Sequence, residues 1–403
     1  MKPRLLFFVE GFTDIRFLVG LSEICELTAC VPARQYNESG LKDRVAASGI
    51  RIAVHEIAGG RPAFQLRSLQ WLWRRAREFD VILSQEVLRG SLNATLVGAM
   101  RQVPVVTTMA VAPIEYFRCR YERGEIGRAR AWAVGGVIRT LMTINGQLAA
   151  RCIALGPYLQ QIAGRFCPRT ESGAYYGVDT CFFRPATDQE RIALRAAHNL
   201  PADSFLIFLS SRISHEKDPE TVLRATALAR AKGLDAVLLN LGGGYKDFVA
   251  LAGQLGLPDA DRWVIGRPAA HPMTEVADYF RAADVVAQAS LAEGLGLSTL
   301  EALACGTPVV ATEVGGMALA LRGLARLTPR RDAAAMADAL LWVASHRQEA
   351  RAQALQGREL VGRDWSREKA FGDLADILNE VSAPRRNRRA VEDGMAAAMT
   401  SRI

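Results

Sequence analysis

The chain has 403 residues, too many for one ordinary domain and enough for two domains of about 200 residues each. Half of the residues are hydrophobic and 23% are charged, a globular composition that provides for two cores. No apolar run approaches the roughly 18 residues of a membrane-spanning helix, and segment 5–9 is followed by Glu10 and Gly11, as in a buried strand and unlike a signal peptide.

The net charge of +8 lies in the first half of the chain. Residues 1–180 contain 23 Lys and Arg against 15 Asp and Glu, whereas residues 181–403 contain 27 of each kind. This excess favours an anionic partner such as a lipid head group, and a solvated arginine-rich surface explains it equally well. The absence of zinc-finger spacing and of an RNA-binding motif argues against nucleic acid. Seven scattered cysteines indicate buried thiols in a reducing, cytoplasmic compartment and no structural zinc.

Short apolar runs alternate with longer amphipathic segments along the whole chain, which is typical of βα units around parallel sheets. In the first half we expect strands at 5–9, 27–31, 52–57, 81–84, 103–107 and 152–155. In the second half we expect them at 205–210, 236–241, 263–265, 285–288 and 308–311. Helical spacing covers 64–79, and a helix over 219–232 is bounded by Asp218 as a cap and Gly233 as a stop.

Segment 176–185 has no amphipathic period and is bracketed by Gly177 and Pro185, so we place the domain boundary there. The expected organisation is a first domain over 1–180, a second over 181–365, a final helix over 366–383, and a basic, mobile tail over 384–403.

Segment 292–312 carries the densest chemical signal. Gly294 and Gly296 allow the backbone to turn tightly and to approach a ligand. Ser298 and Glu301 have the spacing of a capping box, which predicts that a helix begins at Ser298 with its amides directed at the loop. Free amides at a helix start attract phosphate. A capping role alone would also explain Glu301, and Glu293 alone could be a surface charge.

Two further clusters follow expected strands. Arg212 and Lys217 precede the helix that begins near Pro219, and two such cations can hold a diphosphate without a metal ion, although such pairs are also common on surfaces. The glycines 242–244 place a tight turn after the next strand.

Taken together, these segments resemble the family-4 retaining glycosyltransferases of GT-B fold. The resemblance is strong over 175–315 and collinear but weaker elsewhere. It implies an α/β fold with two Rossmann-like domains facing across a cleft, and a final helix that crosses back to the first domain. The matching pieces are the segments 176–185, 211–217, 242–244, 264–266 and 293–312.

The resemblance also implies the role of each matching residue. Arg212 and Lys217 would hold the donor diphosphate and stabilise the leaving phosphate, and Glu293 would contact the sugar near its anomeric carbon. Glu301 would bind the ribose hydroxyls. No metal ion or other cofactor is expected. The donor site would also contain Gly11, Phe12, Gly243, Ile265, Gly294, Leu295, Gly296, Leu297 and Ser298.

The implied activity is transfer of a hexose-type sugar, with retention of configuration, from a UDP- or GDP-sugar. The acceptor would be a saccharide, a lipid-linked molecule or a small molecule, as in the synthesis of envelope polysaccharides or glycoconjugates. Two alternatives remain open: a sugar-nucleotide 2-epimerase of the same architecture, and a nucleotide-sugar-binding partner subunit without activity. Few histidines and intact Arg212, Lys217, Glu293 and Glu301 favour the transferase.

Two features of the first half affect the acceptor side. Many relatives have a histidine after the strand that here covers 103–107, whereas this chain continues with Thr108 and has no histidine nearby. Threonines 107 and 108 could still hydrogen-bond a sugar hydroxyl, and His55 is expected to be structural. Segment 116–151 reads either as a basic amphipathic helix on an anionic membrane, at its inner face, or as a connecting helix packed on the sheet.

Overall fold

The computed structural model describes residues 2–11, 13–268 and 273–400. The chain forms two compact units, each with its own parallel sheet. The first unit contains residues 1–114, 129–176 and 370–403, and the second contains residues 115–128 and 177–369. Segment 115–128 therefore belongs to the second unit although the chain around it belongs to the first.

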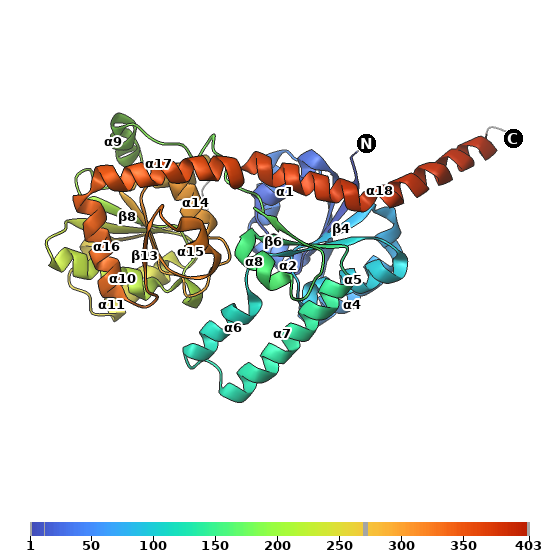
Figure 1. The fold of residues 1–403 in the computed structure, drawn as a ribbon, viewed down its shortest axis with the longest axis horizontal. Coiled ribbons are helices and arrows are strands. Elements are labelled where there is room, and N and C mark those ends of the chain that lie inside the picture. The colour runs from blue at the N-terminus through green and yellow to red at the C-terminus, as the bar shows by residue number, and fades with distance from the viewer. Residues whose placement is uncertain (1, 12, 269–272, 401–403) are drawn as a thin grey trace. The chain divides into compact units, whose positions relative to one another are not determined.

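The first unit has a seven-stranded parallel sheet in the order β3-β2-β1-β4-β5-β6-β7, covered by helices on both faces (Figure 1). Its strands are β1 (Arg4–Phe8), β2 (Glu26–Pro32), β3 (Ala53–Ile57), β4 (Val81–Ser84), β5 (Val105–Met109), β6 (Arg151–Leu155) and β7 (Thr170–Gly173). Its helices are α1 (Ile15–Ile24), α2 (Ala33–Glu38), α3 (Leu41–Ser48), α4 (Arg61–Arg75), α5 (Arg89–Arg101), α7 (Arg128–Leu148) and α8 (Gly156–Ala163). Helix α6 (Pro113–Glu122) starts in this unit and passes into the second.

The second unit has a six-stranded parallel sheet in the order β10-β9-β8-β11-β12-β13. Its strands are β8 (Phe205–Leu209), β9 (Ala236–Leu241), β10 (Val264–Arg267), β11 (Val285–Gln288), β12 (Val309–Thr312) and β13 (Arg326–Thr328). Its helices are α9 (Asp188–Ala197), α10 (Pro219–Ala231), α11 (Tyr245–Gln254), α12 (Ala260–Trp263), α13 (Met273–Ala282), α14 (Leu297–Ala304), α15 (Gly315–Leu321), α16 (Ala333–Ser345) and α17 (Arg347–Asp364).

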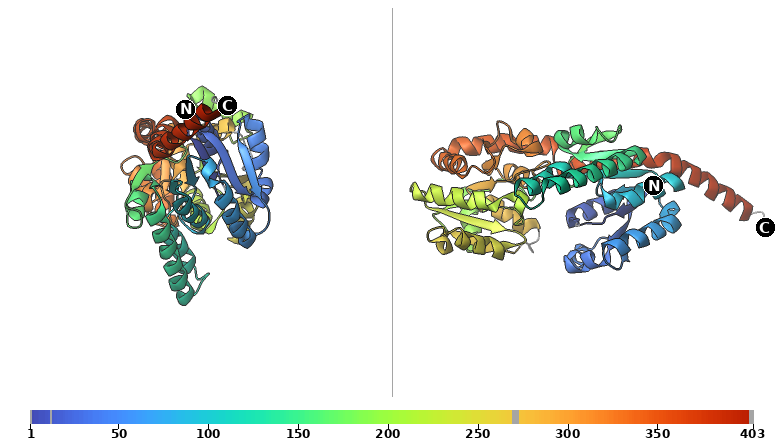
Figure 2. Two further views of the ribbon diagram at one scale, coloured as in Figure 1. Left: turned by 90° about the vertical axis from the view of Figure 1, so that its right-hand side faces the viewer. Right: turned by 90° about the horizontal axis from the view of Figure 1, so that it is seen from below.

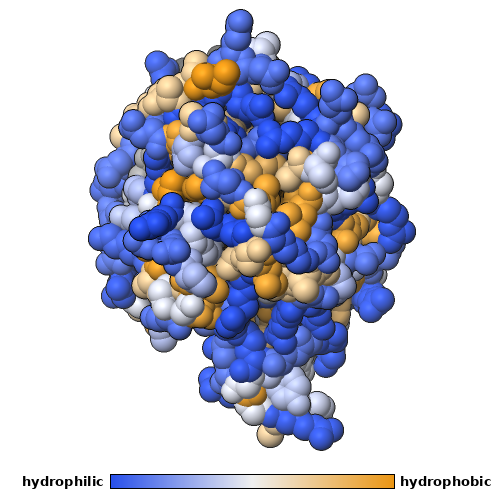
Figure 3. Space-filling view, turned by 90° about the vertical axis from the view of Figure 1, so that its left-hand side faces the viewer, coloured by the Kyte–Doolittle hydropathy of each residue, from blue (hydrophilic) through white to orange (hydrophobic). Residues whose placement is uncertain are grey.

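The central strands of both sheets are mainly apolar and almost completely buried. Every residue of β8 is buried, and β1 has the buried run from Leu5 to Phe8. Continuous burial of this kind is expected for parallel strands that are covered on both faces. The one face of the molecule that Figure 3 draws is mainly hydrophilic, with apolar residues in small groups. The prediction of two Rossmann-like α/β domains is thus confirmed.

The last helix, α18 (Arg367–Thr400), belongs to the first unit from Ala370 onward. It packs closely on α1, because a Cβ on Gly20 would overlap the ring of Phe371. The segment after Pro384, which we expected to be a mobile tail, continues as helix to Thr400. Arg385 donates hydrogen bonds to the carbonyls of Arg77 and Phe79, at 2.6 and 2.8 Å, and so ties this part of α18 to the unit.

At the boundary of the second unit two distant segments lie side by side. Val178 forms a parallel bridge with Ser366, in which the Val178 amide donates to the Trp365 carbonyl at 2.8 Å. Gly177 has a φ of +64°, and a Cβ there would lie 2.5 Å from the Ser366 carbonyl oxygen. Only glycine therefore fits the chain at this point.

Candidate functional site

The residues expected to bind the donor lie at the carboxyl edge of the second sheet. β8 and β11 are neighbours there, and the chain leaves β8 toward β9 and β10 but leaves β11 toward β12 and β13 on the other side. Such a reversal is the topological switch point at which open α/β sheets bind ligands. The loop with Arg212 and Lys217 follows β8, and the loop with Glu293 follows β11.

Lys217 and Glu293 meet across this switch point. The Lys217 Nζ atom donates to Glu293 Oε2 at 2.5 Å, and the two side chains are 21% and 15% exposed. The hydroxyl of Ser290 donates to the same carboxylate oxygen at 3.1 Å, and Gln288 Nε2 donates to that hydroxyl at 2.8 Å. The Glu293 carboxylate is therefore held by two donors at the same oxygen atom.

Arg212 is positioned by a second carboxylate. Its Nη2 atom donates to Glu216 Oε1 at 2.7 Å, and the Glu216 side chain is almost fully buried whereas that of Arg212 is 64% exposed. The Glu216 carbonyl also accepts the amide of Leu291 at 2.8 Å, which joins the loop after β8 to the loop after β11. Because Arg has five N–H donors in a planar fork, most of this guanidinium stays available to an anion.

The glycine turn after β9 supports the Arg212 loop. A Cβ on Gly242 would lie 2.2 Å from the Ser211 carbonyl oxygen, and the Gly243 carbonyl accepts the Ile213 amide at 2.7 Å. The backbones thus approach each other as only glycine allows. Ile265, on the neighbouring strand β10, is partly exposed at the same edge of the sheet.

Helix α14 begins at Leu297, and the expected capping box is absent. Gly296 is the N-cap with a φ of +79°, and no side chain caps the helix. Ser298 lies inside the first turn, so the prediction that Ser298 caps the helix is wrong. Glu301 is buried within α14 and is not the partner of an N-cap hydroxyl. Since the first-turn amides receive no side-chain cap, they stay directed at the loop with Gly294 and Leu295.

Asp218 occupies the N-cap position of α10 as expected, but its side chain does not cap a backbone amide. It occupies the left-handed region at φ 45°, and its carboxylate accepts the hydroxyl of Thr221 at 2.7 Å instead of a backbone amide. Burial raises the pKa of this carboxyl group, and the hydrogen bond from Thr221 partly opposes the shift. The turn of His215–Lys217 that precedes it is a short 3-10 helix, which presents the Lys217 side chain toward β11.

The first unit holds a separate cavity of about 650 Å³ at the carboxyl ends of β1 to β4. Gly11 lines it, whereas Phe12, expected to act with Gly11, lies outside the described residues. The charged side chains around the cavity are Glu10, Arg34, Glu38, Arg61, Glu86 and Arg89. Sequence reasoning did not single them out, because each follows or precedes a different strand and they share no motif.

These charged groups differ in their pairing. Arg89 forms an ion pair with Glu10 at 2.9 Å, and Arg34 forms one with Glu38 at 2.9 Å. Burial raises the pKa of the Glu86 carboxyl group, and the charge of Glu10 raises it further. The cavity thus offers guanidinium groups together with a carboxyl group that is inclined to hold its proton, a mixture suited to a ligand with both hydroxyl and anionic groups.

The threonines that could have replaced the missing histidine are buried in the sheet. Thr107 and Thr108 on β5 are 0% and 3% exposed, so the expectation that they could bind a sugar hydroxyl is not met in this structure. His55 stacks on Trp71 at 4.5 Å, and burial lowers the pKa of its imidazole. Its structural role agrees with the expectation.

Helix α7 has a packed half and an exposed half. Ile138 and Met142 are buried in the first unit, whereas Trp132 is 81% exposed near the start of the helix. This end of α7 extends away from the sheet of its unit (Figure 1, Figure 2), and Arg128 and Arg130 lie beside Trp132 in the sequence. No helix among the described residues combines the length and the apolar character needed to cross a bilayer.

Comparison with protein families finds a match within the second unit. Residues 190–359 match the family model of "Glycosyl transferases group 1". A D-inositol 3-phosphate glycosyltransferase of Saccharomonospora viridis is 38% identical over 222 residues, which cover 51% of this chain and 49% of that protein. D-inositol 3-phosphate glycosyltransferase 1 of Catenulispora acidiphila is 32% identical over 268 residues, with coverage of 62% and 59%. The chain spans about half the length of these curated relatives.

Solved structures share the fold over nearly the whole chain. Anabaena Alr3699/HepE in complex with UDP matches with a TM-score of 0.73 at 18% identity, covering 94% of this chain and 100% of that one. Sucrose-phosphate synthase from Thermosynechococcus elongatus matches with a TM-score of 0.71 at 19% identity, covering 95% and 100%. WaaG, a glycosyltransferase of lipopolysaccharide biosynthesis, matches with a TM-score of 0.68 at 13% identity, covering 93% and 99%. These likenesses show the GT-B fold.

Proposed function

The domain that residues 190–359 form belongs to the glycosyl transferases group 1 family, and on this premise we propose that the chain transfers a hexose-type sugar, with retention, from a nucleoside diphosphate sugar. The observation that carries the proposal is the meeting of Lys217 and Glu293 at the switch point, beside Arg212 and the open start of α14. HepE has been solved with UDP and with UDP-glucose, which supports a UDP- or GDP-linked donor.

In the proposed reaction the cations act on the leaving group. The diphosphate competes with Glu293 for Lys217 and engages the exposed face of Arg212, so both charges stabilise the nucleotide phosphate as the glycosidic bond breaks. The freed Glu293 carboxylate turns to the sugar near the anomeric carbon. Glu301 binds the ribose, and the amides of α14 and its loop bind phosphate and sugar. No metal ion takes part.

A loose, oxocarbenium-like transition state needs positioning more than a strong base. We propose that the acceptor attacks from the face that the phosphate leaves, and that a phosphate oxygen accepts the acceptor's proton. The absence of a histidine after β5 agrees with this route. The test is the configuration of the product, read by NMR of the anomeric proton. An inverted anomer would overturn the retaining mechanism while leaving the transferase activity standing.

For the acceptor we propose a saccharide or polyol that carries a phosphate, either free or lipid-linked, as in glycoconjugate synthesis. The arginines of the first-unit cavity support this choice, and the two relatives are named for an inositol phosphate. Arg61, which forms no ion pair within the described part of the chain, is the most available of them. Arg61→Gln should raise KM for a phosphorylated acceptor about tenfold and leave KM unchanged for its dephosphorylated form. Arg74→Gln, on the same helix outside the cavity, serves as control.

We also propose that the exposed end of α7 contacts an anionic membrane at its cytoplasmic face. Trp132 and the neighbouring arginines supply an apolar side chain flanked by positive charge, which is the combination that interfacial helices use. The full chain should co-sediment with vesicles that contain phosphatidylglycerol and not with neutral vesicles, and Trp132→Ala together with Arg128→Gln and Arg130→Gln should abolish this binding. Equal sedimentation with both kinds of vesicle, or with neither, would remove the membrane from the proposal.

A further inference from the structure

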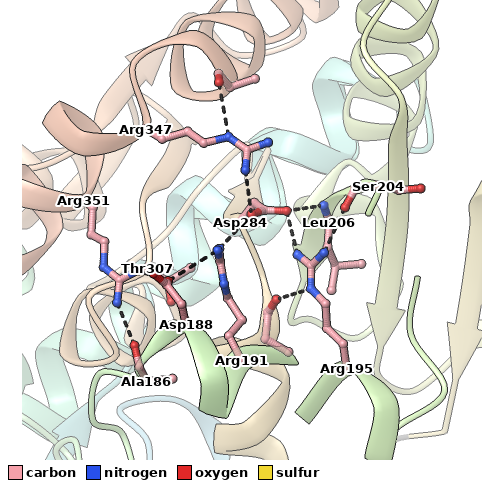
Figure 4. A network of polar contacts seen from close by, with 12 residues as sticks. Ala186, Asp188, Arg191, Arg195, Ser204, Leu206, Asp284, Thr307, Arg347 and Arg351 are labelled. Atoms are coloured by element: carbon pink, nitrogen blue, oxygen red, sulfur yellow. Dashed lines mark hydrogen bonds and ion pairs between the residues drawn. The ribbon is translucent and has the colours of Figure 1, made fainter. Parts of the chain in front are cut away.

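The second unit has another cavity, of about 330 Å³, at the edge of the sheet opposite to the donor loops (Figure 4). It lies where strands begin: Phe205 starts β8, Asp284 precedes β11, and Pro308 precedes β12. In a parallel sheet the starts of the strands share one edge and their ends share the other. The cavity is therefore separate from the site at Lys217 and Glu293.

Asp284, which lines the cavity, forms a buried ion pair with Arg195. Arg195 Nη2 bonds Asp284 Oδ2 at 2.7 Å, both side chains are under 10% exposed, and the Leu206 amide donates to the same oxygen at 2.7 Å. Arg195 also donates to the carbonyls of Pro201, Ala202, Ser204 and Ala282. Asp284 thus has its charge matched by Arg195.

Three more arginines reach the same place. Arg191 on α9 approaches Asp284 Oδ1 at 3.0 Å, Arg347 on α17 approaches the same atom at 3.9 Å, and Arg351 approaches Asp188 Oδ1 at 3.5 Å. Asp188 is 78% exposed, so water screens its charge. Arg281 also lines the cavity, but Glu190 and Asp278 neutralise it at 3.1 Å each. Apart from Arg281 and its two partners, the guanidinium groups of Arg191, Arg195, Arg347 and Arg351 stand against the carboxylates of Asp188 and Asp284, an excess of two positive charges (Figure 4).

The arginines of α17 keep donors for a ligand. Arg347 and Arg351 lie one helical turn apart and line the cavity together, although like charges at this spacing repel. Besides its long contact with Asp284, Arg347 makes a 3.4 Å hydrogen bond to the Ala344 carbonyl and lies 5.6 Å from the centre of the Phe205 ring. Arg351 uses Nη2 for the Ala186 carbonyl at 2.7 Å. The remaining N–H groups of Arg191, Arg347 and Arg351 are suited to the oxygens of a doubly charged anion.

We propose that this cavity binds the phosphate group of a small molecule, held by Arg191, Arg347 and Arg351 at a site distinct from the donor site. A dianion matches the two excess charges, and the volume lies at the lower end of the range for small-ligand sites, which leaves room for a short organic moiety beside the phosphate. The shared chemistry is a phosphate monoester or free phosphate. The wall formed by Cys305–Thr307 directly follows α14, so the ligand lies against the far end of the helix that carries Glu301.

The test uses hydrogen–deuterium exchange of the full chain, because it reads each site separately. Inorganic phosphate, compared with sodium chloride of equal ionic strength, should slow amide exchange in 186–195 and 343–351. The effect should persist in Arg212→Gln/Lys217→Gln, which removes phosphate binding at the donor loops. In Arg347→Gln/Arg351→Gln the phosphate concentration that gives half of the protection should rise at least about tenfold. Arg363→Gln, an exposed arginine of the same helix, should behave like the wild type.

Glycerol 3-phosphate in place of phosphate distinguishes the two sources. Protection at a lower concentration identifies a phosphorylated small molecule, and protection only at an equal or higher concentration identifies free phosphate. The proposal is overturned if phosphate leaves exchange in these segments unchanged in the wild type, or if Arg347→Gln/Arg351→Gln retains the full effect. Unchanged UDP binding by this variant shows that the second unit is folded, so that a loss of protection reports the site itself.

Discussion

At the scale of single residues, the proposed donor site consists of charged side chains that form ion pairs with one another in the absence of a ligand. Lys217 forms an ion pair with Glu293, and Arg212 forms one with Glu216, so each cation already has a carboxylate partner. The two pairs differ, because the first is partly buried and the second leaves its arginine in water. A diphosphate gains contacts with Arg212 at little cost, whereas it must displace Glu293 from Lys217. In the proposed reaction, displacement of Glu293 from Lys217 would link phosphate binding to the release of the Glu293 carboxylate toward the sugar.

Glu293→Gln tests this exchange. The amide keeps the shape of the side chain but cannot pair with Lys217 or stabilise positive charge at the anomeric carbon, so kcat should fall about 100-fold or more. Nucleotide affinity should be retained or rise, because Lys217 is freed for the diphosphate. Steady-state kinetics and calorimetry with UDP measure the two quantities. Glu313→Gln, an exposed carboxylate after β12, should leave both unchanged; a fully active Glu293→Gln enzyme would refute the assigned role.

Glu86 makes a prediction about pH. Because burial raises its pKa above that of the unfolded chain, its contribution to stability is present at low pH and is lost as the pH rises through the folded value. Glu86→Gln has no charge to bury, so its urea midpoint should exceed that of the wild type at pH 8. The difference should shrink as the pH falls toward 4. Glu78→Gln, whose carboxylate is exposed, should show no such trend, and a wild type as stable as Glu86→Gln at pH 8 would contradict the argument.

At the scale of elements, the sequence predicts the inner strands of each sheet and one of its two edge strands, and it misses the other edge strand. The apolar runs identified eleven strands, from 5–9 to 308–311, each within a few residues of its place. β7 and β13 were missed, because Thr170–Gly173 has no apolar residue and Arg326–Thr328 has only three residues. Both are edge strands with one neighbour each, so their burial is low and leaves little signal in the pattern.

The candidate site, like the sheets, was predicted from the sequence only in part. Spacing placed Arg212, Lys217, Gly243 and Glu293 after the right strands, and parallel topology brings the ends of those strands to one edge. The capping box failed because Ser298 matches a local motif whose geometry depends on φ at Gly296, which the sequence does not display. The pairing of Arg195 with Asp284, 89 positions apart, has no local signal at all.

Gly296→Ala tests the start of α14. A φ of +79° and a Cβ 2.9 Å from Met317 Cγ make alanine strained there, so the variant should lose more than about 1 kcal/mol of unfolding free energy and bind UDP at least tenfold more weakly. Gly253→Ala is the matched control, since it lies in α11 with no atom within 4 Å of its added Cβ. It should gain up to about 1 kcal/mol with unchanged UDP affinity. Chemical denaturation and calorimetry distinguish the two, and equal behaviour would show that Gly296 is not required.

At the scale of the whole molecule, the two units divide the chemistry between them. The second carries the cations and amides suited to a nucleotide diphosphate, and the first carries a cavity with arginines and carboxyl groups of its own. The lining of that cavity is balanced, with three arginines against three glutamates, so the basic excess of the first 180 residues has its counterpart elsewhere, in part at the exposed end of α7 with Arg128 and Arg130.

Binding of UDP to the whole molecule should not need a metal ion. With excess EDTA, UDP at about 100 times its dissociation constant should raise the unfolding free energy by about 2.7 kcal/mol, visible as a higher melting midpoint. Arg212→Gln/Lys217→Gln should lose this shift. A shift that appears only after Mg²⁺ or Mn²⁺ is added would show that the cations of the loop after β8 do not suffice.

Segment 115–128 matters for anyone who builds chimeras from this protein. Because it belongs to the second unit, the chain passes between units four times, after residues 114, 128, 176 and 369. Within the second unit Glu122 pairs with Arg330 at 3.2 Å, and Arg123 donates to the His215 carbonyl, two residues before Lys217. A donor domain grafted as 177–369 alone would leave these partners behind. An exchange of donor specificity between homologues therefore has to carry 115–128 along with the second unit, even though this segment lies in the half that the acceptor side occupies.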